Sequence, residues 1–333
     1  MPIATKTEKT INPTAYDVIG DIHGRFDKFE ALMNALGYRA ASGTFVPPAG
    51  RQAVFVGDLI DRGPEQVRLL KAVRNMIEAG HALAVMGNHE FNAIAYVTPD
   101  PAVTDRQEFL RINSGDSAKC HQNRRQHAAF LAQVGETSAE HMMWVEWFRT
   151  LPLHLDLGGI RVAHAWWDEA SVDLLDQTPH RDASGRLTDE FLVESHRRGS
   201  ALKKARKILT TGYEHKLPAG HFVTDKEGNK HDNARVKIWK HEAERLHEVA
   251  IVPGGDTSAL PNLRLAQVFE RPLSPVAGSP IFVGHYWFSG QVRVESSKVA
   301  VLDWSAAHHG PLVAYRWDGE EHLSDDKFVA VNV

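Results

Sequence analysis

The stretch from Val54 to Pro64, VFVGDLIDRGP, constrains this chain more than any other. An apolar run with the character of a strand stops at Gly57, and the carboxylate of Asp58 follows directly. A carboxylate just after a buried strand lies at the carboxyl end of that strand, where open α/β sheets bind their ligands. The stretch therefore predicts a sheet with a polar site at one edge.

Several other apolar runs end on a polar residue in the same way. They end at Asp21, Asn88, His164, His285 and Asp303. A single residue of this kind would usually be a helix cap, but six polar residues that each end an apolar run indicate one common site.

The first part of the chain alternates between two kinds of pattern. Short apolar runs at residues 15–20, 53–57 and 82–86 predict strands, and residues at helical spacing lie between them, with Pro64 expected to open the second helix. This order predicts parallel strands joined by right-handed crossovers. Later, residues 153–157 and 160–163 are typical of a β-hairpin, and residues 281–284 and 299–302 of two further strands.

Composition sets outer limits on the class of protein. The 333 residues are 43% hydrophobic, enough for a substantial core, and the net charge of −4, with both signs mixed, argues neither for a nucleic-acid protein nor for a membrane-surface protein. The single cysteine, Cys120, excludes an intramolecular disulfide framework. Residues 1–14 are expected to form a flexible polar arm without the apolar region of a signal peptide, so we expect a cytoplasmic protein with no membrane partner.

The polar residues at the strand ends can bind metal ions. Asp21 and His23 lie two residues apart in a turn, so both can bind one cation, and the two oxygens of Asp58 can bridge two cations. Asn88, His164 and His285 could complete the second site, although each lone histidine has a structural role as its alternative. Oxygen and imidazole ligands suit Mn, Fe, Zn, Co or Ni better than calcium. Two such ions about 3.5 to 4 Å apart are suited to in-line displacement at phosphorus.

Three motifs give the chain a family resemblance. Residues 20–24 (GDIHG), 57–63 (GDLIDRG) and 87–90 (GNHE) resemble the signature blocks of the calcineurin-like metallophosphoesterases, close to the PPP-type phosphoprotein phosphatases and the symmetrical diadenosine tetraphosphatases. The resemblance implies an α/β fold in which two mixed sheets pack as a sandwich flanked by helices. A single domain over residues 15–333 would carry an inserted helical and β-hairpin segment at about 166–278.

The resemblance also implies a role for each residue of the site. It assigns one divalent ion to Asp21, His23 and Asp58 and the other to Asp58, Asn88, His164 and His285, with manganese as the first choice. His89 would be the general acid, Asp61 would orient His89, and Arg62 would bind phosphate oxygens together with Asn88. The alternatives are a mere neighbour of a metal ligand for His89 and a surface salt bridge for Arg62.

The sequence departs from the family pattern in two places. Ala165-Trp166-Trp167 follows His164 where the family has two glycines, and Trp166 could stack on a nucleobase or cover the core. The second phosphate-binding arginine of the phosphoprotein phosphatases has no aligned counterpart. Its candidates are Arg197, Arg198, Arg206 and Arg235, with Arg235 taken as the substrate contact. Asp303 could be a strand-end cap or a site residue.

These observations predict a metal-dependent phosphoric ester hydrolase. The first hypothesis is a phosphomonoesterase that uses a metal-bridging hydroxide, with phosphorylated Ser, Thr or Tyr in proteins as a candidate substrate. The second hypothesis keeps the site but makes the substrate a nucleotide or a nucleic-acid end, such as a dinucleoside polyphosphate or a 2′,3′-cyclic phosphate. The third is a binding module with a degenerate phosphatase fold. The expected partner is thus a phosphorylated small molecule, phosphopeptide or nucleotide, without a stable nucleic-acid complex.

Overall fold

The computed structural model describes residues 14–104, 108–224, 230–252, 257, 260–269 and 272–333. The polar arm predicted for residues 1–14 lies outside these residues except for Thr14. Within the described residues, no helix has both the length and the apolar character needed to cross a membrane.

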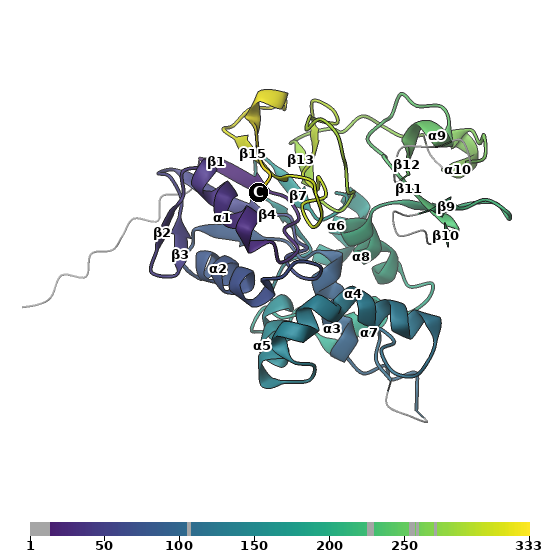
Figure 1. Ribbon diagram of the computed structural model, residues 1–333. Helices are drawn as coiled ribbons and strands as arrows, with labels where there is room; N and C mark the ends of the chain where they lie inside the picture. The colour runs from purple at the N-terminus through teal and green to yellow at the C-terminus, as the bar shows by residue number, and fades with distance from the viewer. Residues whose placement is uncertain (1–13, 105–107, 225–229, 253–256, 258–259, 270–271) are drawn as a thin grey trace, which may run out of the picture.

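The first sheet has five strands in the order β16-β15-β1-β4-β5, of which β15, β1 and β4 are labelled in Figure 1. Its strands are β1 (Ala15–Ile19), β4 (Arg51–Phe55), β5 (Ala82–Ala84), β15 (Leu312–Trp317) and β16 (Phe328–Val331). β1, β4 and β5 are parallel, as predicted, whereas β15 runs antiparallel to β1. Helices α1 (Phe26–Ala35) and α2 (Gln66–Glu78) connect the parallel strands.

The expected start of α2 at Pro64 is wrong by two residues. The helix begins at Gln66 because the side chain of Gln66 binds the preceding turn: its Oε1 accepts the N–H of Asp61 and its Nε2 donates to the carbonyl of Gly63. Pro64 therefore belongs to the turn that presents Asp61 and Arg62.

The second sheet has four strands in the order β14-β13-β7-β6. They are β6 (His154–Asp156), β7 (Arg161–Ala163), β13 (Ile281–Val283) and β14 (Val299–Val301). β6 and β7 form the predicted antiparallel hairpin, and β13 is parallel to both β7 and β14. Both sheets are mixed, and one apolar cluster joins them, with Val18 and Val54 from the first sheet and Val162 and Phe282 from the second. The predicted sandwich is confirmed.

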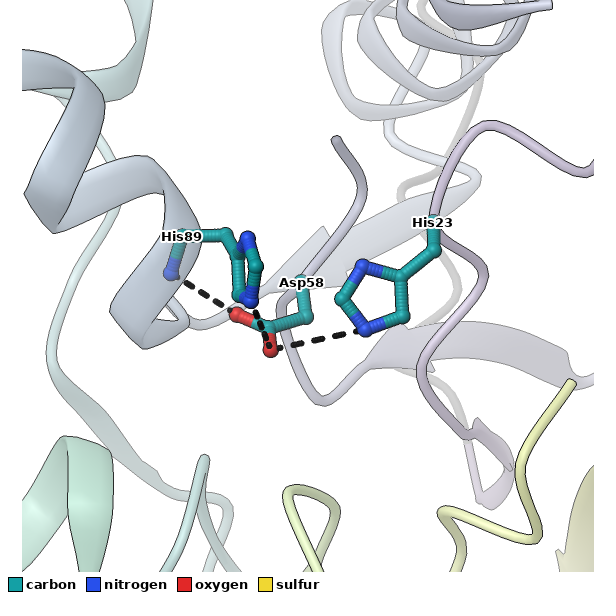
Figure 2. Close-up of side chains that lie close together, drawn as sticks. All are labelled: His23, Asp58 and His89. Carbon is teal, nitrogen blue, oxygen red and sulfur yellow. Dashed lines mark hydrogen bonds and ion pairs between the residues drawn. The ribbon is translucent and has the colours of Figure 1, made fainter. Parts of the chain in front are cut away.

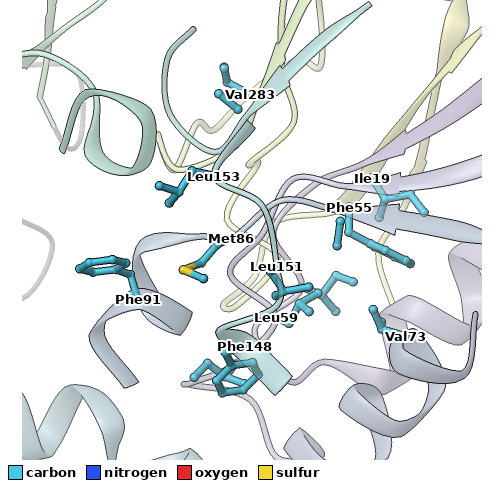
Figure 3. Close-up of a cluster of buried hydrophobic side chains, with 14 of the residues drawn as sticks. Ile19, Phe55, Leu59, Val73, Met86, Phe91, Phe148, Leu151, Leu153 and Val283 are labelled. Carbon is cyan, nitrogen blue, oxygen red and sulfur yellow. The ribbon is translucent and has the colours of Figure 1, made fainter. Parts of the chain in front are cut away.

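The opposite face of the first sheet is covered by helices, because side chains alternate between the two faces of a strand. Ile19 and Phe55 pack there against Val73 of α2, in the same cluster as Phe148 at the end of α5 (Ala139–Phe148) (Figure 3). The remaining elements before β6 are β2 (Arg39–Ala41), β3 (Thr44–Val46), α3 (Asn88–Val97), α4 (Ala118–Val134) and α5 (Ala139–Phe148).

The segment between β7 and β13 combines helices with small sheets. Its elements are α6 (Glu169–Asp176), α7 (Asp189–Glu194), α8 (Ala201–Thr211), β8 (Glu214–Lys216), β9 (Val223–Thr224), β10 (Lys230–His231), β11 (Asn233–Val236), α9 (Leu246–Val249), β12 (Ala250–Ile251) and α10 (Leu265–Val268). Strands β12, β11 and β8 form a sheet over a separate apolar cluster that contains Ala234, Val236 and Leu246. The segment thus has its own small core.

Candidate metal and phosphate site

The polar residues that follow the strands have an unusual backbone. His23, Asp58, Asp61, Arg62 and His285 all have positive φ, between 50° and 74°. Such conformations cost about 1 to 3 kcal/mol for residues other than glycine, and they cluster at functional sites. They turn side chains from the ends of both sheets toward one point.

Asp58 lies at the centre of these converging side chains. Its Oδ2 is 3.7 Å from Nε2 of His23, 3.8 Å from Nε2 of His89 and 3.3 Å from Nε2 of His164. Figure 2 shows the rings of His23 and His89 on two sides of the carboxylate. Potential ligand atoms within 4.8 Å of one another form two groups that share Asp58, namely His23 with His89 and His164 with His285.

The unpaired atoms at this point fit the donor set of metal cations. Oδ1 of Asp21, Nε2 of His23 and Nε2 of His285 are buried and find no hydrogen-bond partner among the described residues. A buried polar atom without a partner is costly, and coordination of a cation would satisfy it. The opposite nitrogens of two rings are bound: Nδ1 of His23 lies 2.8 Å from the carbonyl of Ile60, and Nδ1 of His164 lies 2.8 Å from that of Val56. Metal-binding histidines are usually oriented in this way.

Asp21 and Asn88 complete the neighbourhood. Oδ2 of Asp21 accepts the backbone N–H of His285 at 3.0 Å, which ties the first sheet to the second. Oδ1 of Asn88 lies 3.2 Å from Nε2 of His164. The structure thus brings the six predicted ligand residues together.

The charges at the site favour a bound cation. Burial and the nearby carboxylate of Asp303 raise the pKa of Asp21 well above its ordinary value. Burial also acts to raise the pKa of Asp58, but the imidazoles of His164 and His89 outweigh it and hold that pKa well below the usual range. A positive charge nearby therefore stabilises the ionised form of a buried carboxylate at this site, and a bound cation would do so for Asp21 as well as for Asp58.

Glu90 holds the loop that carries Asp58, a role that the sequence did not indicate. Its fully buried carboxylate accepts the backbone N–H groups of Asp58 and Gly87 at Oε2 and those of Leu59 and Ile60 at Oε1. Four backbone donors are satisfied by one side chain, which fixes the loops after β4 and β5 relative to each other.

The carboxylate of Asp61 is bound by two histidine side chains, His89 and His127. Nδ1 of His89 donates to Oδ2 of Asp61 at 2.5 Å, and Nδ1 of His127 lies 2.8 Å from Oδ1 of the same carboxylate. Burial acts to raise the pKa of Asp61, but the two histidines lower it below its ordinary range. His127 lies on α4, in a segment whose sequence gave no sign of a site.

A cavity of about 1510 Å³ opens over this site. Arg62, Arg235 and Trp287 line it together with His23 and His89. Of the four candidate arginines, Arg235 is the one at the cavity. Arg206 instead packs over Phe91 and donates to the carbonyl of Ser195, Arg197 pairs with Glu194, and Arg198 is not among the lining residues.

Two further residues take structural positions. Trp166, one of the predicted substrate contacts, is buried, stacks on Trp239 at 5.5 Å between ring centroids and is not among the residues that line the cavity, a position that matches the alternative in which it covers the core. Asp303 lines the cavity, but its two oxygens accept the backbone N–H groups of Trp287 and Ser305 at 2.8 and 3.0 Å. It therefore fixes the loop after β13 as well as the one after β14.

Comparison with known proteins identifies the family to which the chain is similar. The model of the calcineurin-like phosphoesterases matches residues 16–323. Over 87 residues the chain is 44% identical to the bis(5′-nucleosyl)-tetraphosphatase PrpE (asymmetrical) of Bacillus velezensis and 41% identical to that of Bacillus subtilis. These alignments cover 26% of the chain and 35% and 36% of the relatives, so the chain matches about a third of their length. A cold-active protein-tyrosine phosphatase of a Shewanella species is 15% identical with a TM-score of 0.42, covering 94% of this chain and 81% of that one.

Proposed function

Because the chain belongs to the calcineurin-like phosphoesterase family, we propose that it is a metal-dependent hydrolase of phosphomonoesters that uses two divalent ions. The observation that supports this most directly is the set of buried, unpaired ligand atoms of Asp21, His23 and His285 around Asp58. Phosphorylated Ser, Thr or Tyr in proteins is a candidate substrate.

The proposed ligand sets share one carboxylate. Asp21, His23 and Asp58 would hold one ion, and Asp58, Asn88, His164 and His285 the other, with manganese as the proposed native metal. When bound, the two ions would supply the charge that stabilises the phosphoryl oxygens and activates water. Elemental analysis of protein purified without added metal tests both the number of ions and their identity.

His89 is proposed as the general acid. Its Nδ1 is held by Asp61, so Nε2 can carry the proton that the leaving oxygen requires, and Asp61 stabilises the protonated ring. Arg62 lines the same cavity and offers planar paired donors to the phosphoryl oxygens.

The experiment compares wild-type protein with His89→Asn on p-nitrophenyl phosphate with manganese. We expect kcat to fall by roughly 10²- to 10⁴-fold at unchanged metal content, because general acid catalysis contributes about that factor. His121→Asn, at an exposed histidine that pairs with Asp116, is the matched control and should retain wild-type kcat. Unchanged turnover in His89→Asn would refute the acid role, and a fully metal-loaded wild type that hydrolyses no phosphate ester would refute the phosphoesterase itself.

A nucleotide substrate is the second candidate, and the cavity favours it. Its volume of about 1510 Å³ exceeds the roughly 300 to 1,000 Å³ of most small-molecule pockets. Cationic side chains outside the proposed ligand set also line it, namely Lys119, Arg125, Lys230 and Arg293. The relatives named as tetraphosphatases accord with this candidate. One preparation assayed on a phosphopeptide, diadenosine tetraphosphate and a 2′,3′-cyclic nucleotide separates the candidates, since failure on both nucleotides would remove the second.

We further propose that residues 15–333 form one domain in which the segment at about 166–278 is an insertion over the site. The cavity lining supports this, because it takes Arg235 from β11 together with His89 from α3. A single cooperative unfolding transition seen by both fluorescence and circular dichroism is expected, whereas two separate transitions would contradict it.

A further inference from the structure

Trp287 occupies an unusual position beside the metal ligands. It follows His285 by two residues, has a φ of 49°, and donates its backbone N–H to Asp303. Its ring is half-buried and lines the cavity. A large aromatic side chain in a left-handed turn is uncommon, and such turns are kept where the surrounding structure holds them in place.

Two arginines contact this one ring. Cζ of Arg235 lies 4.7 Å from the ring centroid and Cζ of Arg62 lies 5.5 Å from it, both within the distance for cation–π attraction. Arg62 comes from the turn after β4, whereas Arg235 comes from β11 in the inserted segment. Trp287 therefore joins a cation of the sandwich to a cation of the insertion.

The arginines have few other partners. Among the residues that the structure describes, Arg62 has no carboxylate within ion-pair distance, its buried Nε has no hydrogen-bond partner, and its Nη1 lies 3.3 Å from Nε2 of His308. Arg235 forms a loose ion pair in which its Nε lies 3.8 Å from Oε1 of Glu214. Neither charge is firmly neutralised by the residues that the structure describes, so both guanidinium groups remain available to an anion.

Both arginines line the same cavity as His23, a proposed metal ligand, and His89, the proposed general acid. The two cations therefore lie beside the proposed metal and phosphate site.

We propose that Trp287 is a positioning residue that holds the guanidinium groups of Arg62 and Arg235 beside the metal site so that both bind one phosphoryl group. This inference rests on the proposed phosphoesterase function. The ring keeps two like charges in place without neutralising them, which a carboxylate could not do. A nucleobase would have to compete with the guanidinium groups for the ring, so the inference assigns Trp287 to the phosphoryl group of the substrate.

The test compares Trp287→Leu, which removes the aromatic ring, with Trp287→Phe, which keeps one. Both variants are loaded with manganese. Calorimetry gives the Kd for inorganic phosphate, and steady-state assays on p-nitrophenyl phosphate give kcat and KM. We expect Leu to raise the phosphate Kd and KM roughly tenfold, Phe to raise them by a smaller factor, and kcat to change less than KM. Phe222→Leu, which removes the cation–π partner of Lys230 at a ring that does not line the cavity, is the matched control and should leave Kd unchanged.

A double-mutant cycle shows whether Trp287 acts through the arginine. The effect of Trp287→Leu on phosphate Kd should fall below about threefold when Arg235→Met is already present, because residues that act together are not additive. Equal losses with Leu and Phe, or an undiminished effect in the Arg235→Met background, would overturn the inference. If the Trp287→Leu protein also loses its metal, the same double-mutant cycle is measured with Trp287→Phe in place of Trp287→Leu. An effect of Trp287→Phe on phosphate Kd that does not shrink in the Arg235→Met background would then overturn the inference. If wild-type protein hydrolyses no ester, the proposed function fails, while phosphate binding still decides the role of Trp287.

Discussion

Replacement of Glu90 by glutamine tests how the loop that carries Asp58 is held. The carboxylate accepts four backbone N–H groups, two at each oxygen. A glutamine amide keeps one accepting oxygen and turns the other into an NH₂ group, which cannot accept a hydrogen bond. Two of the four buried N–H groups therefore lose their partner.

The magnitude follows from these two lost bonds. A buried donor left without a partner costs about 1 to 3 kcal/mol, so the free energy of unfolding should fall by roughly 2 to 6 kcal/mol. Native proteins have only about 5 to 15 kcal/mol in total, so the loss should be evident. Metal binding should weaken as well, because Asp58 and Gly87 lie on the two loops that Glu90 joins.

Urea unfolding followed by tryptophan fluorescence measures the free energy, and elemental analysis measures the retained metal. Glu78→Gln is the control, because Glu78 is exposed on α2 and, in the described part of the chain, forms an ion pair with Arg74 alone, so its loss should cost less than about 1 kcal/mol. A Glu90→Gln protein within about 1 kcal/mol of wild type, with full metal content, would refute the reasoning.

Three other substitutions probe the site and its supports. A Cβ at Gly87 would lie 2.2 Å from Oδ1 of Asp58, so Gly87→Ala should displace that carboxylate and lower the metal content found by elemental analysis; full occupancy would contradict this. The buried Lys28 donates to the carbonyls of Ala306, His308 and Gly310, so Lys28→Met should lower the free energy of urea unfolding by about 2 to 5 kcal/mol, and no change would be the contrary result. Burial and the charge of His127 lower the pKa of His141 to about 4 from 6.5. The unfolded chain therefore binds this proton first, and stability should be constant above about pH 6.5 and fall between pH 6.5 and pH 4. His141→Asn should flatten that fall in unfolding curves, and an unaltered pH dependence would exclude His141 as its source.

The central residues of the site could be predicted from the sequence because a residue at the end of a strand has a known place at the edge of the sheet. Asp21, Asp58 and Asn88 follow three parallel strands of one sheet, and such ends meet at one edge. His164 and His285 follow two parallel strands of the second sheet, so the same rule brings them together.

The supporting residues could not be predicted in this way. His127 reaches Asp61 from a helix in a polar stretch, and Glu90 faces inward because of the turn that begins α3. The direction of Trp166 depends on its stack with Trp239, which is distant in the sequence. Each of these positions is set by packing between remote segments, which local periodicity does not encode.

The division of the proposed ligands between two sheets affects how the protein would respond to cleavage. Residues up to Phe148 contain Asp21, His23, Asp58 and Asn88, whereas residues after Leu151 contain His164 and His285. A chain nicked between α5 and β6 would therefore consist of two fragments that each carry only part of the proposed ligand set, held together by the β1–β15 pairing and the shared apolar cluster. Bound metal should strengthen the association of those fragments, so in the nicked protein a chelator should weaken that association as well as inhibit activity.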